Sequence, residues 1–230
     1  MSNRFSLLPH ASVAPNYGVL LLVLCLLVIC APVATRAGSA YGVEALFDLV
    51  LIAGAYSSAS RGGQRWPFLG LTALTLATRW SALLWGGFGL ELASALTTVV
   101  WIALAIVIVV RELFRQREVT VNAIFGAIVA YLLAAVAFAY LYEILELFQP
   151  GSFSGIPDGA SPQELGDALL YFSLVSLTTM GYGDIVPASS LARPVAVFEG
   201  VFGALYLAVM IARLVGLNIA TGMRREENEP

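Results

Sequence analysis

The sequence predicts an all-α membrane protein, with six membrane-spanning helices and one short helix that enters the membrane without crossing it. Two observations predict this fold class. Hydrophobic residues make up 59% of the chain and charged residues only 12%, and a soluble domain cannot bury that much apolar surface. The apolar residues also form runs of about 20 residues, the length that a helix needs to cross a bilayer.

The apolar runs place the six spans at 17–35, 41–58, 66–86, 92–110, 119–147 and 191–222. The first and fourth spans carry no charged residue, and Cys25 and Cys30 lie in the first as small apolar residues. A cleaved signal peptide is the alternative for the first span, because Arg4 precedes it and small residues follow at 37–40. The length of the apolar segment favours a retained helix.

The arginines predict the orientation, because the cytoplasmic loops of membrane proteins carry the excess of basic residues. With a cytoplasmic N-terminus, the arginines that fall inside are Arg4, Arg61, Arg65, Arg111, Arg115, Arg117, Arg224 and Arg225, whereas Arg36 and Arg193 fall outside. The acidic residues expected outside are Glu143, Glu146, Asp158, Glu164, Asp167 and Asp184. An acidic mouth raises the local concentration of cations. We therefore expect a multi-pass protein of the plasma membrane with both termini in the cytoplasm.

A short helix is predicted over 162–177, between the fifth and sixth spans. Ser161 can cap this helix, Pro162 suits its first position, and Glu164 stands where a capping box has its acid. The helix is too short to span the membrane, so it should enter from outside and end near the middle. The chain then returns through the polar segment 178–184. Irregular backbone at that depth is tolerated only where it is buried in protein or lines a cavity.

The segment TTMGYGD, residues 178–184, resembles the selectivity filter of the tetrameric potassium channels, whose common form is TTVGYGD. The resemblance implies that backbone carbonyls replace the water shell of K⁺. The ion sites that it assigns are Thr178, Thr179, Met180, Gly181, Tyr182 and Gly183, with K⁺ held by the carbonyls of residues 179–182 and the Thr179 hydroxyl. The side chains of Met180 and Tyr182 would point into the packing behind. The two glycines can adopt backbone angles that turn successive carbonyls to one side.

The same resemblance assigns roles outside this segment. The residues assigned to support of the filter are Tyr171, Phe172, Asp184 and Glu143, and Gly203 is assigned as the hinge of the inner helix. Glu143 closes the stretch AFAYLYE and matches an acid that braces the filter loop from behind. The resemblance covers about 119–222 well, whereas the first four helices match the family only in number.

Three departures from the family pattern bear on selectivity. Met180 replaces the usual valine, which would loosen the packing of the filter. Tyr171 and Phe172 stand where many members have paired tryptophans, and Phe172 cannot donate a hydrogen bond. Val175 stands where some members place a second carboxylate. These departures underlie the alternative of a weakly selective filter.

The fourth span lacks the arginines of a voltage sensor. Each charge that crosses the field contributes about 2.3 kcal/mol per 100 mV, yet 92–110 is uncharged. Arg111, Arg115 and Arg117 follow in a polar linker and fit the basic cytoplasmic flank. We therefore expect a vestigial or scaffold sensor in the first four helices, and no strong voltage gating.

Two arginines remain inside spans. Counted along the helices, Arg79 lies roughly 20 Å above the inner surface and Asp48 roughly 10 Å below the outer one. These depths coincide in a core about 30 Å thick, and a lone charge there is costly. We predict a buried ion pair of Asp48 and Arg79, which Glu44 could share. Glu199 and Arg213 share a face of the sixth span, and snorkelling, a bond to the fifth span or a ring near an inner gate are all open for Arg213.

These expectations combine into one functional hypothesis. Residues 1–118 form a four-helix sensor-like or scaffold domain, 119–222 a pore domain with its inner helix at 191–222, and 223–230 a short cytoplasmic tail. One chain supplies one filter segment and a carbonyl cage needs four, so we expect a closed homotetramer. It would conduct K⁺ passively, with K⁺ and the lipid bilayer as partners, no nucleic acid, and no cofactor besides the K⁺ in the filter. No nucleophile, metal set or nucleotide loop indicates an enzyme.

Three alternatives stay open. A weakly selective cation channel would use the same cage, loosened at Met180. A potassium transporter subunit would normally carry several pore repeats in one chain, and only one is present. The third alternative is a non-conducting regulatory membrane subunit. The K⁺/Na⁺ permeability ratio tests the first alternative, and K⁺ efflux from liposomes tests the third.

Overall fold

The structure, a computed structural model, describes residues 17–58, 65–116, 118–157 and 159–227 of the 230-residue chain. Its elements are α1 (Tyr17–Arg36), α2 (Ala40–Ser58), α3 (Arg65–Trp85), α4 (Phe88–Arg115), α5 (Val121–Phe148), β1 (Phe153–Ser154), α6 (Pro162–Leu177), β2 (Val186–Pro187) and α7 (Ala192–Glu227). Every predicted helix is present, and α6 has the predicted bounds. Of the residues that bear on the predicted orientation, Arg4, Arg61, Arg117 and Asp158 lie outside the described residues.

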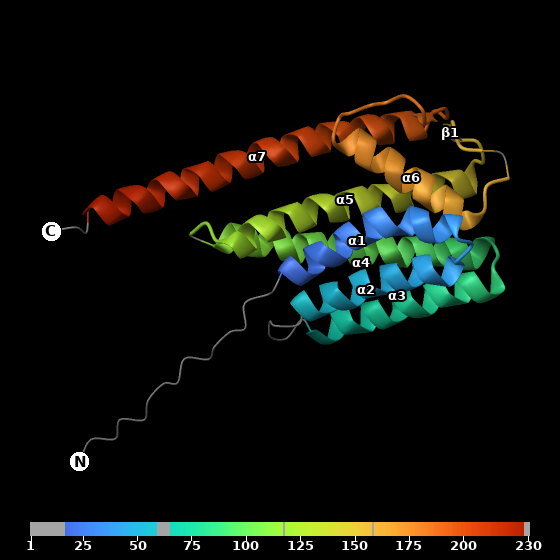
Figure 1. Ribbon diagram of the computed structural model, residues 1–230, viewed down its shortest axis with the longest axis horizontal. Coiled ribbons are helices and arrows are strands. Elements are labelled where there is room, and N and C mark those ends of the chain that lie inside the picture. The colour runs from blue at the N-terminus through green and yellow to red at the C-terminus, as the bar shows by residue number, and fades with distance from the viewer. Residues whose placement is uncertain (1–16, 59–64, 117, 158, 228–230) are drawn as a thin grey trace, which may run out of the picture.

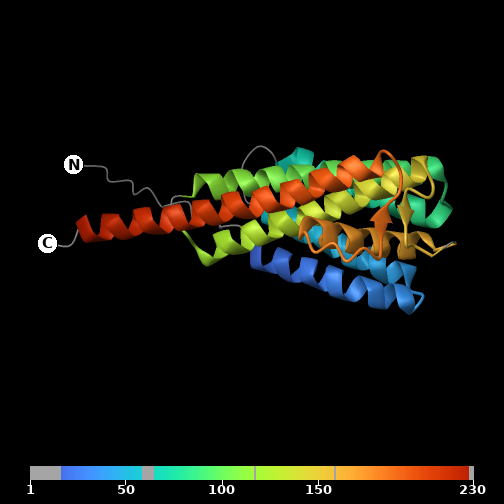
Figure 2. The ribbon, with the colours of Figure 1, turned by 90° about the horizontal axis from the view of Figure 1, so that it is seen from above.

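Helices α1 to α5 form one bundle in which successive helices run in opposite directions (Figures 1 and 2). Helix α6 lies obliquely against α5. It begins at the end of the bundle where α5 ends and stops partway along (Figure 1). Helix α7 starts at that same end, runs back past α6 and α5, and extends beyond the other helices. The segment 178–184 therefore leaves the end of α6 and leads back toward the start of α7.

Four helices of the described residues are long and apolar enough to cross a membrane. They are α1, α4, α5 and the part of α7 from Ala192 to Ile219. Helices α2 and α3, of 19 and 21 residues, do not meet this criterion, although they pack against α1 and α4 in the same bundle. The protein is mostly helical with four candidate spans, and the crossing of the membrane by α2 and α3 remains a prediction.

The core of the bundle is centred on Trp101 of α4. Its ring is fully buried and donates a hydrogen bond from Nε1 to the Thr72 hydroxyl at 2.8 Å. The ring of Phe68 of α3 is tilted against it, with 5.2 Å between the ring centres. A Cβ added to Gly54 of α2 would lie 2.4 Å from the Trp101 ring. The glycine is therefore what allows α2 to approach the indole. A buried Trp needs a partner for its N–H, and Thr72 supplies one without a charge.

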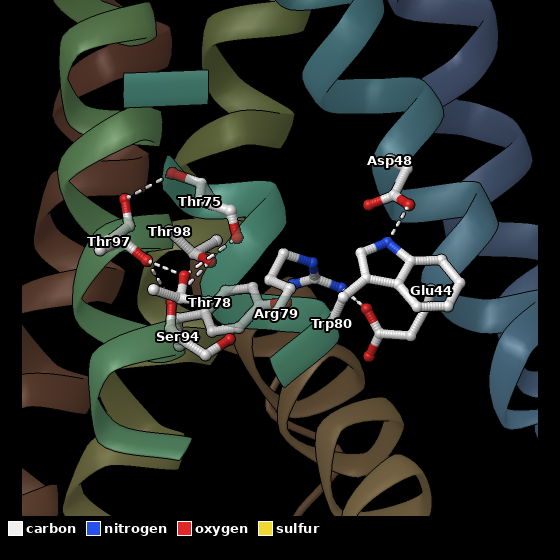
Figure 3. A network of polar contacts seen from close by, with 10 residues as sticks. Glu44, Asp48, Thr75, Thr78, Arg79, Trp80, Ser94, Thr97 and Thr98 are labelled. Carbon is white, nitrogen blue, oxygen red and sulfur yellow. Dashed lines mark hydrogen bonds and ion pairs between the residues drawn. The ribbon is translucent and has the colours of Figure 1, made fainter. Parts of the chain in front are cut away.

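Hydroxyl groups join α3 to α4. The Thr78 and Thr97 hydroxyls are hydrogen-bonded at 2.8 Å, and the Thr75 hydroxyl reaches the Thr97 carbonyl at 3.5 Å (Figure 3). Small hydroxyl residues let membrane helices approach closely and bond to each other. This interface therefore fixes the helix that carries Arg79.

Arg79 is 4% exposed and forms its ion pair with Glu44, not with Asp48 as predicted (Figure 3). It also donates to the Tyr140 hydroxyl of α5, and its guanidinium lies 4.2 Å from the centre of the Phe47 ring. The ion pair was expected because a lone buried charge is costly, and that expectation is correct. The partner differs because Glu44 and Asp48 are one turn apart on α2, and a count of depth cannot separate them.

Asp48 has a different partner. Its carboxylate accepts a hydrogen bond of 2.9 Å from Nε1 of Trp80, the residue after Arg79 (Figure 3). Neighbouring residues of α3 thus bind two acids of α2 that lie one turn apart. The arrangement ties α2 to α3 by polar contacts and holds Arg79 between α2 and α5.

Candidate functional site

The start of α6 is held by a capping box. The Ser161 hydroxyl accepts from the Glu164 N–H at 3.3 Å, and the Glu164 carboxylate accepts from the Ser161 N–H at 2.7 Å. Pro162 occupies the first helical position, where its missing N–H costs nothing. The hydrogen bond from the Ser161 backbone also lowers the pKa of Glu164. The local sequence thus determines where this helix begins.

The end of α6 is a Schellman motif, the arrangement in which N–H groups after a helix return to its last carbonyls. The Met180 N–H donates to the Val175 carbonyl at 2.9 Å, and the Thr179 N–H donates to the Ser176 carbonyl at 3.0 Å. The motif requires a left-handed residue after the cap, and Thr179 takes that place with φ 59°. Glycine is usual there, so a β-branched residue is strained. Such strain concentrates at functional sites.

Beyond Thr179, the backbone alternates. Gly181 has φ 58° and Gly183 has φ 79°, whereas Met180 and Tyr182 between them have negative φ, because Thr179 is the sole non-glycine with positive φ in the described residues. Positive φ at the two glycines fits the predicted arrangement, in which successive carbonyls turn to one side. All of 178–184 is exposed in the single chain. The segment therefore offers its backbone to something other than its own chain.

Met180 and Tyr182 are 62% and 65% exposed. Both side chains were expected to enter the packing behind the segment. A single chain does not supply that packing, and the expectation stays a prediction for the assembled protein. Large apolar and aromatic side chains beside exposed backbone mark a surface that requires further contacts.

The return segment is tied to the loop before α6. Strands β1 and β2 pair antiparallel, with Phe153 opposite Pro187. The Ser152 carbonyl accepts from the N–H groups of Ala188 and Ser189 at 2.8 and 3.2 Å. A Cβ added to Gly155, whose φ is 95°, would lie 1.9 Å from the Asp184 carbonyl oxygen. These contacts fix the chain immediately after residues 178–184.

The acid that holds this loop is Glu146, not Glu143. Its carboxylate accepts from the N–H groups of Gly151 and Ser152 at 2.5 and 2.9 Å. Glu143 lies one turn earlier on α5 and faces a cavity that Arg79 also lines. Glu146 therefore holds the loop before α6, and the role of Glu143 as a support of residues 178–184 stays a prediction.

Tyr171 and Phe172 of α6 contact different surroundings. The Tyr171 hydroxyl donates to the Asp184 carboxylate at 2.7 Å and holds the pKa of Asp184 below its ordinary value. Phe172 is buried, with its ring centre 5.2 Å from that of Tyr142 and 5.3 Å from that of Phe153. Tyr171 thus connects α6 to the end of the segment, and Phe172 anchors α6 to α5 and β1.

Glu199 of α7 is a buried residue whose role the sequence analysis missed. Its carboxyl group is fully buried and accepts hydrogen bonds from the hydroxyls of Tyr142 and Ser173. The Ser173 hydroxyl also lies 2.7 Å from the Ala135 carbonyl. The carboxyl therefore joins α5, α6 and α7 behind the site. An acid in the middle of an apolar span was the available signal, but the sequence did not show which helices it joins.

Gly203 allows α7 to touch the end of α6. A Cβ at this position would lie 2.1 Å from the Leu177 carbonyl oxygen, which also accepts a hydrogen bond of 2.9 Å from the Tyr131 hydroxyl. Helix α7 is continuous through Gly203. Close packing accounts for the glycine in this structure, and its role as a hinge stays a prediction.

Arg213 contacts the end of α4. Its guanidinium donates to the carbonyls of Leu113 and of Gln116, the latter at 3.2 Å, and lies 4.4 Å from the centre of the Phe114 ring. A cation at a helix C-terminus is favourable because the last carbonyls there are unpaired. The sequence left open a bond to the fifth span, and the structure shows a bond to the end of α4 instead.

Two comparisons with known proteins bear on this region. Residues 119–219 match the model of a family described as "Ion channel". The sequence is also 33% identical to Protein LctB of Bacillus caldotenax over 87 residues, which are 37% of this chain. The chain covers 64% of the length of that relative. The family match supports an ion-channel domain from the start of α5 into α7, and the apolar helices support a membrane protein.

Proposed function

We propose that this protein is a potassium-selective channel, which conducts K⁺ passively across the plasma membrane as a homotetramer with cytoplasmic termini. The observation that carries the proposal is the segment 178–184, whose φ angles alternate in sign beside the end of a short buried helix. Rings of backbone carbonyls are what potassium filters use to replace the hydration shell of the ion. The carbonyls of residues 179–182 and the Thr179 hydroxyl would hold K⁺.

Exposure of this segment supports the tetramer. Irregular backbone cannot face lipid, because nothing there satisfies its polar groups. One chain leaves 178–184 exposed, together with the side chains of Met180 and Tyr182. Four copies around an axis would turn the carbonyls toward a shared ion path and cover the side chains with a neighbouring subunit. Cyclic symmetry closes such an assembly.

The test is reconstitution of the purified full chain in planar bilayers, with K⁺ on one side and Na⁺ on the other. We expect a reversal potential that reports strong preference for K⁺, and we expect Rb⁺ to permeate. Thr179→Ala should reduce K⁺ conduction by about tenfold or more, because it removes a hydroxyl ligand, whereas Thr179→Ser should retain it. A reversal near zero, or no current together with no K⁺ efflux from liposomes, would contradict the proposal. Native mass spectrometry should detect a tetramer.

A second candidate is a weakly selective cation channel. Met180 favours it, because this flexible side chain is 62% exposed and stands where the resembling family has valine. In that case Met180→Val should raise the K⁺/Na⁺ permeability ratio severalfold without loss of the tetramer. This candidate is excluded if the unsubstituted protein already has a high K⁺/Na⁺ permeability ratio and Met180→Val leaves that ratio unchanged.

A further inference from the structure

Glu199 lies within the apolar part of α7 and is fully buried inside one chain. Neither lipid nor a neighbouring subunit can therefore contact its carboxyl group, so its partners come from its own chain. No basic side chain of the described residues forms an ion pair with it. An ionised carboxylate without a cation is costly in an apolar interior.

The oxygens around Glu199 need more protons than the neighbouring hydroxyls can supply. The Ser173 hydroxyl is within hydrogen-bond distance of one carboxyl oxygen of Glu199 and lies 2.7 Å from the Ala135 carbonyl of α5. A hydroxyl has one proton to donate, and a backbone carbonyl can only accept. At that distance the Ser173 proton belongs to the Ala135 carbonyl. The proton between Ser173 and Glu199 must then come from Glu199.

Tyr142 of α5 fits the same arrangement. Its hydroxyl contacts the second oxygen of the Glu199 carboxyl. A neutral carboxylic acid donates from one oxygen and accepts at the other, so it can donate to Ser173 and accept from Tyr142. An ionised Glu199 would instead accept from both hydroxyls. The Ser173 oxygen and the Ala135 carbonyl would then lie in contact with no proton between them.

The other groups around Glu199 do not change this count of protons. Tyr131 of α5 is close enough to interact with Glu199 electrostatically, but its hydroxyl donates to the Leu177 carbonyl at 2.9 Å. Helix α6 contributes the uncharged Ser173, and β2, which also packs against α7, consists of a valine and a proline. Among the described residues, no charged side chain faces Glu199.

We propose that Glu199 is a proton-binding site and, through α6, a positioning residue for the segment 178–184. As a neutral acid it donates to Ser173, which leaves the Ser173 proton for the Ala135 carbonyl. One proton thus completes the contacts that join α6 to both α5 and α7. When Glu199 ionises, Ser173 turns its proton to the carboxylate and the bond from α6 to α5 is lost. The binding of the proton does not depend on conduction, whereas its effect on K⁺ conduction rests on the proposed function.

Infrared spectroscopy of the purified full chain in lipid at neutral pH tests the protonation. A protonated carboxyl group has a C=O stretching band that an ionised one lacks. The difference between the spectra of the wild type and Glu199→Gln should contain this band. The difference for Glu118→Gln, the matched control, should not, because Glu118 is exposed and exposed glutamates are ionised at neutral pH.

Tyr142→Phe gives a second spectroscopic result. It should move the C=O band of Glu199 to higher frequency, because the carbonyl oxygen of the acid loses its hydrogen-bond donor. A loss of packing alone would not produce that shift. Absence of the band from the Glu199→Gln difference would overturn the proposal, since Glu199 would then be ionised.

Two substitutions at Glu199 separate the hydrogen bonds from the charge. Glutamine resembles the neutral acid, because its amide donates to Ser173 and accepts from Tyr142. Glu199→Gln should therefore assemble and unfold at a temperature close to that of the wild type. Glu199→Leu makes neither bond and should unfold at a clearly lower temperature. If Glu199→Gln fails to assemble, or is as unstable as Glu199→Leu, the site requires an ionised carboxylate and the proposal is wrong.

The effect on conduction is measured in planar bilayers across the range of alkaline pH in which the infrared band is lost. The K⁺ current of the wild type should fall severalfold across that range, whereas Glu199→Gln should keep its current because it has no proton to lose. A current that falls equally in both proteins, or that falls while the band persists, would overturn the positioning role. Absence of any current in the wild type would contradict the proposed function, and the infrared spectra would still decide the protonation of Glu199.

Discussion

The helices α1 and α4 and the segment from α6 to α7 expose different chemistry, although both regions belong to one apolar chain. Exposed positions in α1 and α4 are mostly apolar side chains on continuous helices, such as Leu22 and Leu96. Residues 178–184 are exposed as well, but they are irregular backbone instead of helix. Lipid can cover apolar side chains on a helix but cannot satisfy the polar groups of irregular backbone. The helices α1 and α4 are therefore compatible with lipid on their own, whereas in the proposed assembly neighbouring subunits would cover the segment after α6.

The same contrast separates the buried charges of the two regions. In the bundle, Arg79 meets an opposite charge, Glu44, and is held against an aromatic ring. Behind residues 178–184, Glu199 meets only the hydroxyls of Tyr142 and Ser173. Each group joins three helices, but the Arg79 contacts include an opposite charge, whereas those of Glu199 are neutral hydroxyls.

Gly203→Ala should have the largest effect. The added Cβ would lie 2.1 Å from the Leu177 carbonyl oxygen, which is backbone and cannot move aside without displacing the end of α6. We expect a loss of stability of about 3 kcal/mol or more, measured by thermal unfolding in detergent. Gly216→Ala is the matched control, because the same helix has open space there. Its effect should stay within about 1 kcal/mol. Equal effects of both variants would show that the close approach of α7 does not determine stability.

The Arg79–Glu44 pair should have an effect of similar size. Arg79→Gln leaves the partly buried Glu44 without its cation, and the loss of one member of a buried pair typically costs about 3–5 kcal/mol. The double variant with Glu44→Gln should cost clearly less than the sum of the single variants. The corresponding cycle of Arg79→Gln with Asp48→Asn should show a smaller coupling, because Asp48 bonds to Trp80. Thermal unfolding of the six proteins measures both cycles. A larger coupling with Asp48 would restore the pairing expected from the sequence.

The two double-mutant cycles ask which acid pairs with Arg79, and this is a question that the sequence could not answer. The bounds of α6 could be predicted, because Ser161, Pro162 and Glu164 act within one turn of the helix start. The partner of Arg79 could not, since Glu44 and Asp48 differ by one turn, about 5.4 Å, and helix tilt alone can shift the choice. Local signals fix where a helix begins, whereas the contacts between helices depend on tilt and rotation.

Glu199 and Gly203 show a second limit. The sequence marks both as unusual in an apolar helix, an acid and a glycine. Their roles depend on the distance between α7 and α6, which brings Gly203 against the Leu177 carbonyl and Glu199 against Ser173. The pattern of residues within one helix does not predict how closely that helix approaches another. The motif at 178–184 could be recognised because it is made of consecutive residues. The contacts of Glu199 and Gly203 behind it could not be recognised, because they join separate helices.

Tyr171→Phe should have a smaller effect on stability, and this effect should depend on pH in the acidic range. The Tyr171 hydroxyl holds the pKa of Asp184 below its ordinary value of 3.8. A lowered pKa in the folded state contributes stability above the ordinary value, and this stability is lost as the pH falls through the lowered pKa. The phenylalanine variant lacks this contribution, so the pKa of Asp184 should rise and stability should fall less steeply between about pH 5 and pH 2. Carbon-13 NMR of the Asp184 carboxyl measures the pKa directly. An unchanged pKa would show that this hydrogen bond is absent in solution.

Voltage should have the smallest effect, because the bundle offers few charges that can move. In α4, the described basic residues are Arg111 and Arg115, both exposed near its C-terminal end. Arg79 is fixed by Glu44 and Tyr140 and would have to leave both to cross the field. Even full transfer of one charge per subunit contributes about 2.3 kcal/mol per 100 mV, whereas working sensors move three to four.

A conductance–voltage curve from bilayer recordings tests this expectation. If the bundle is a scaffold, the open probability should vary shallowly between strongly negative and positive potentials, and Arg79→Gln should leave the slope unchanged in whatever fraction still assembles. A steep curve that Arg79→Gln flattens would identify Arg79 as a moving charge, and the first four helices would then be a sensor built on α3. A steep curve that this variant leaves intact would instead assign the movement to Arg111 and Arg115. The slope and its response to one substitution therefore separate a bundle that only supports the ion-channel domain from one that controls it.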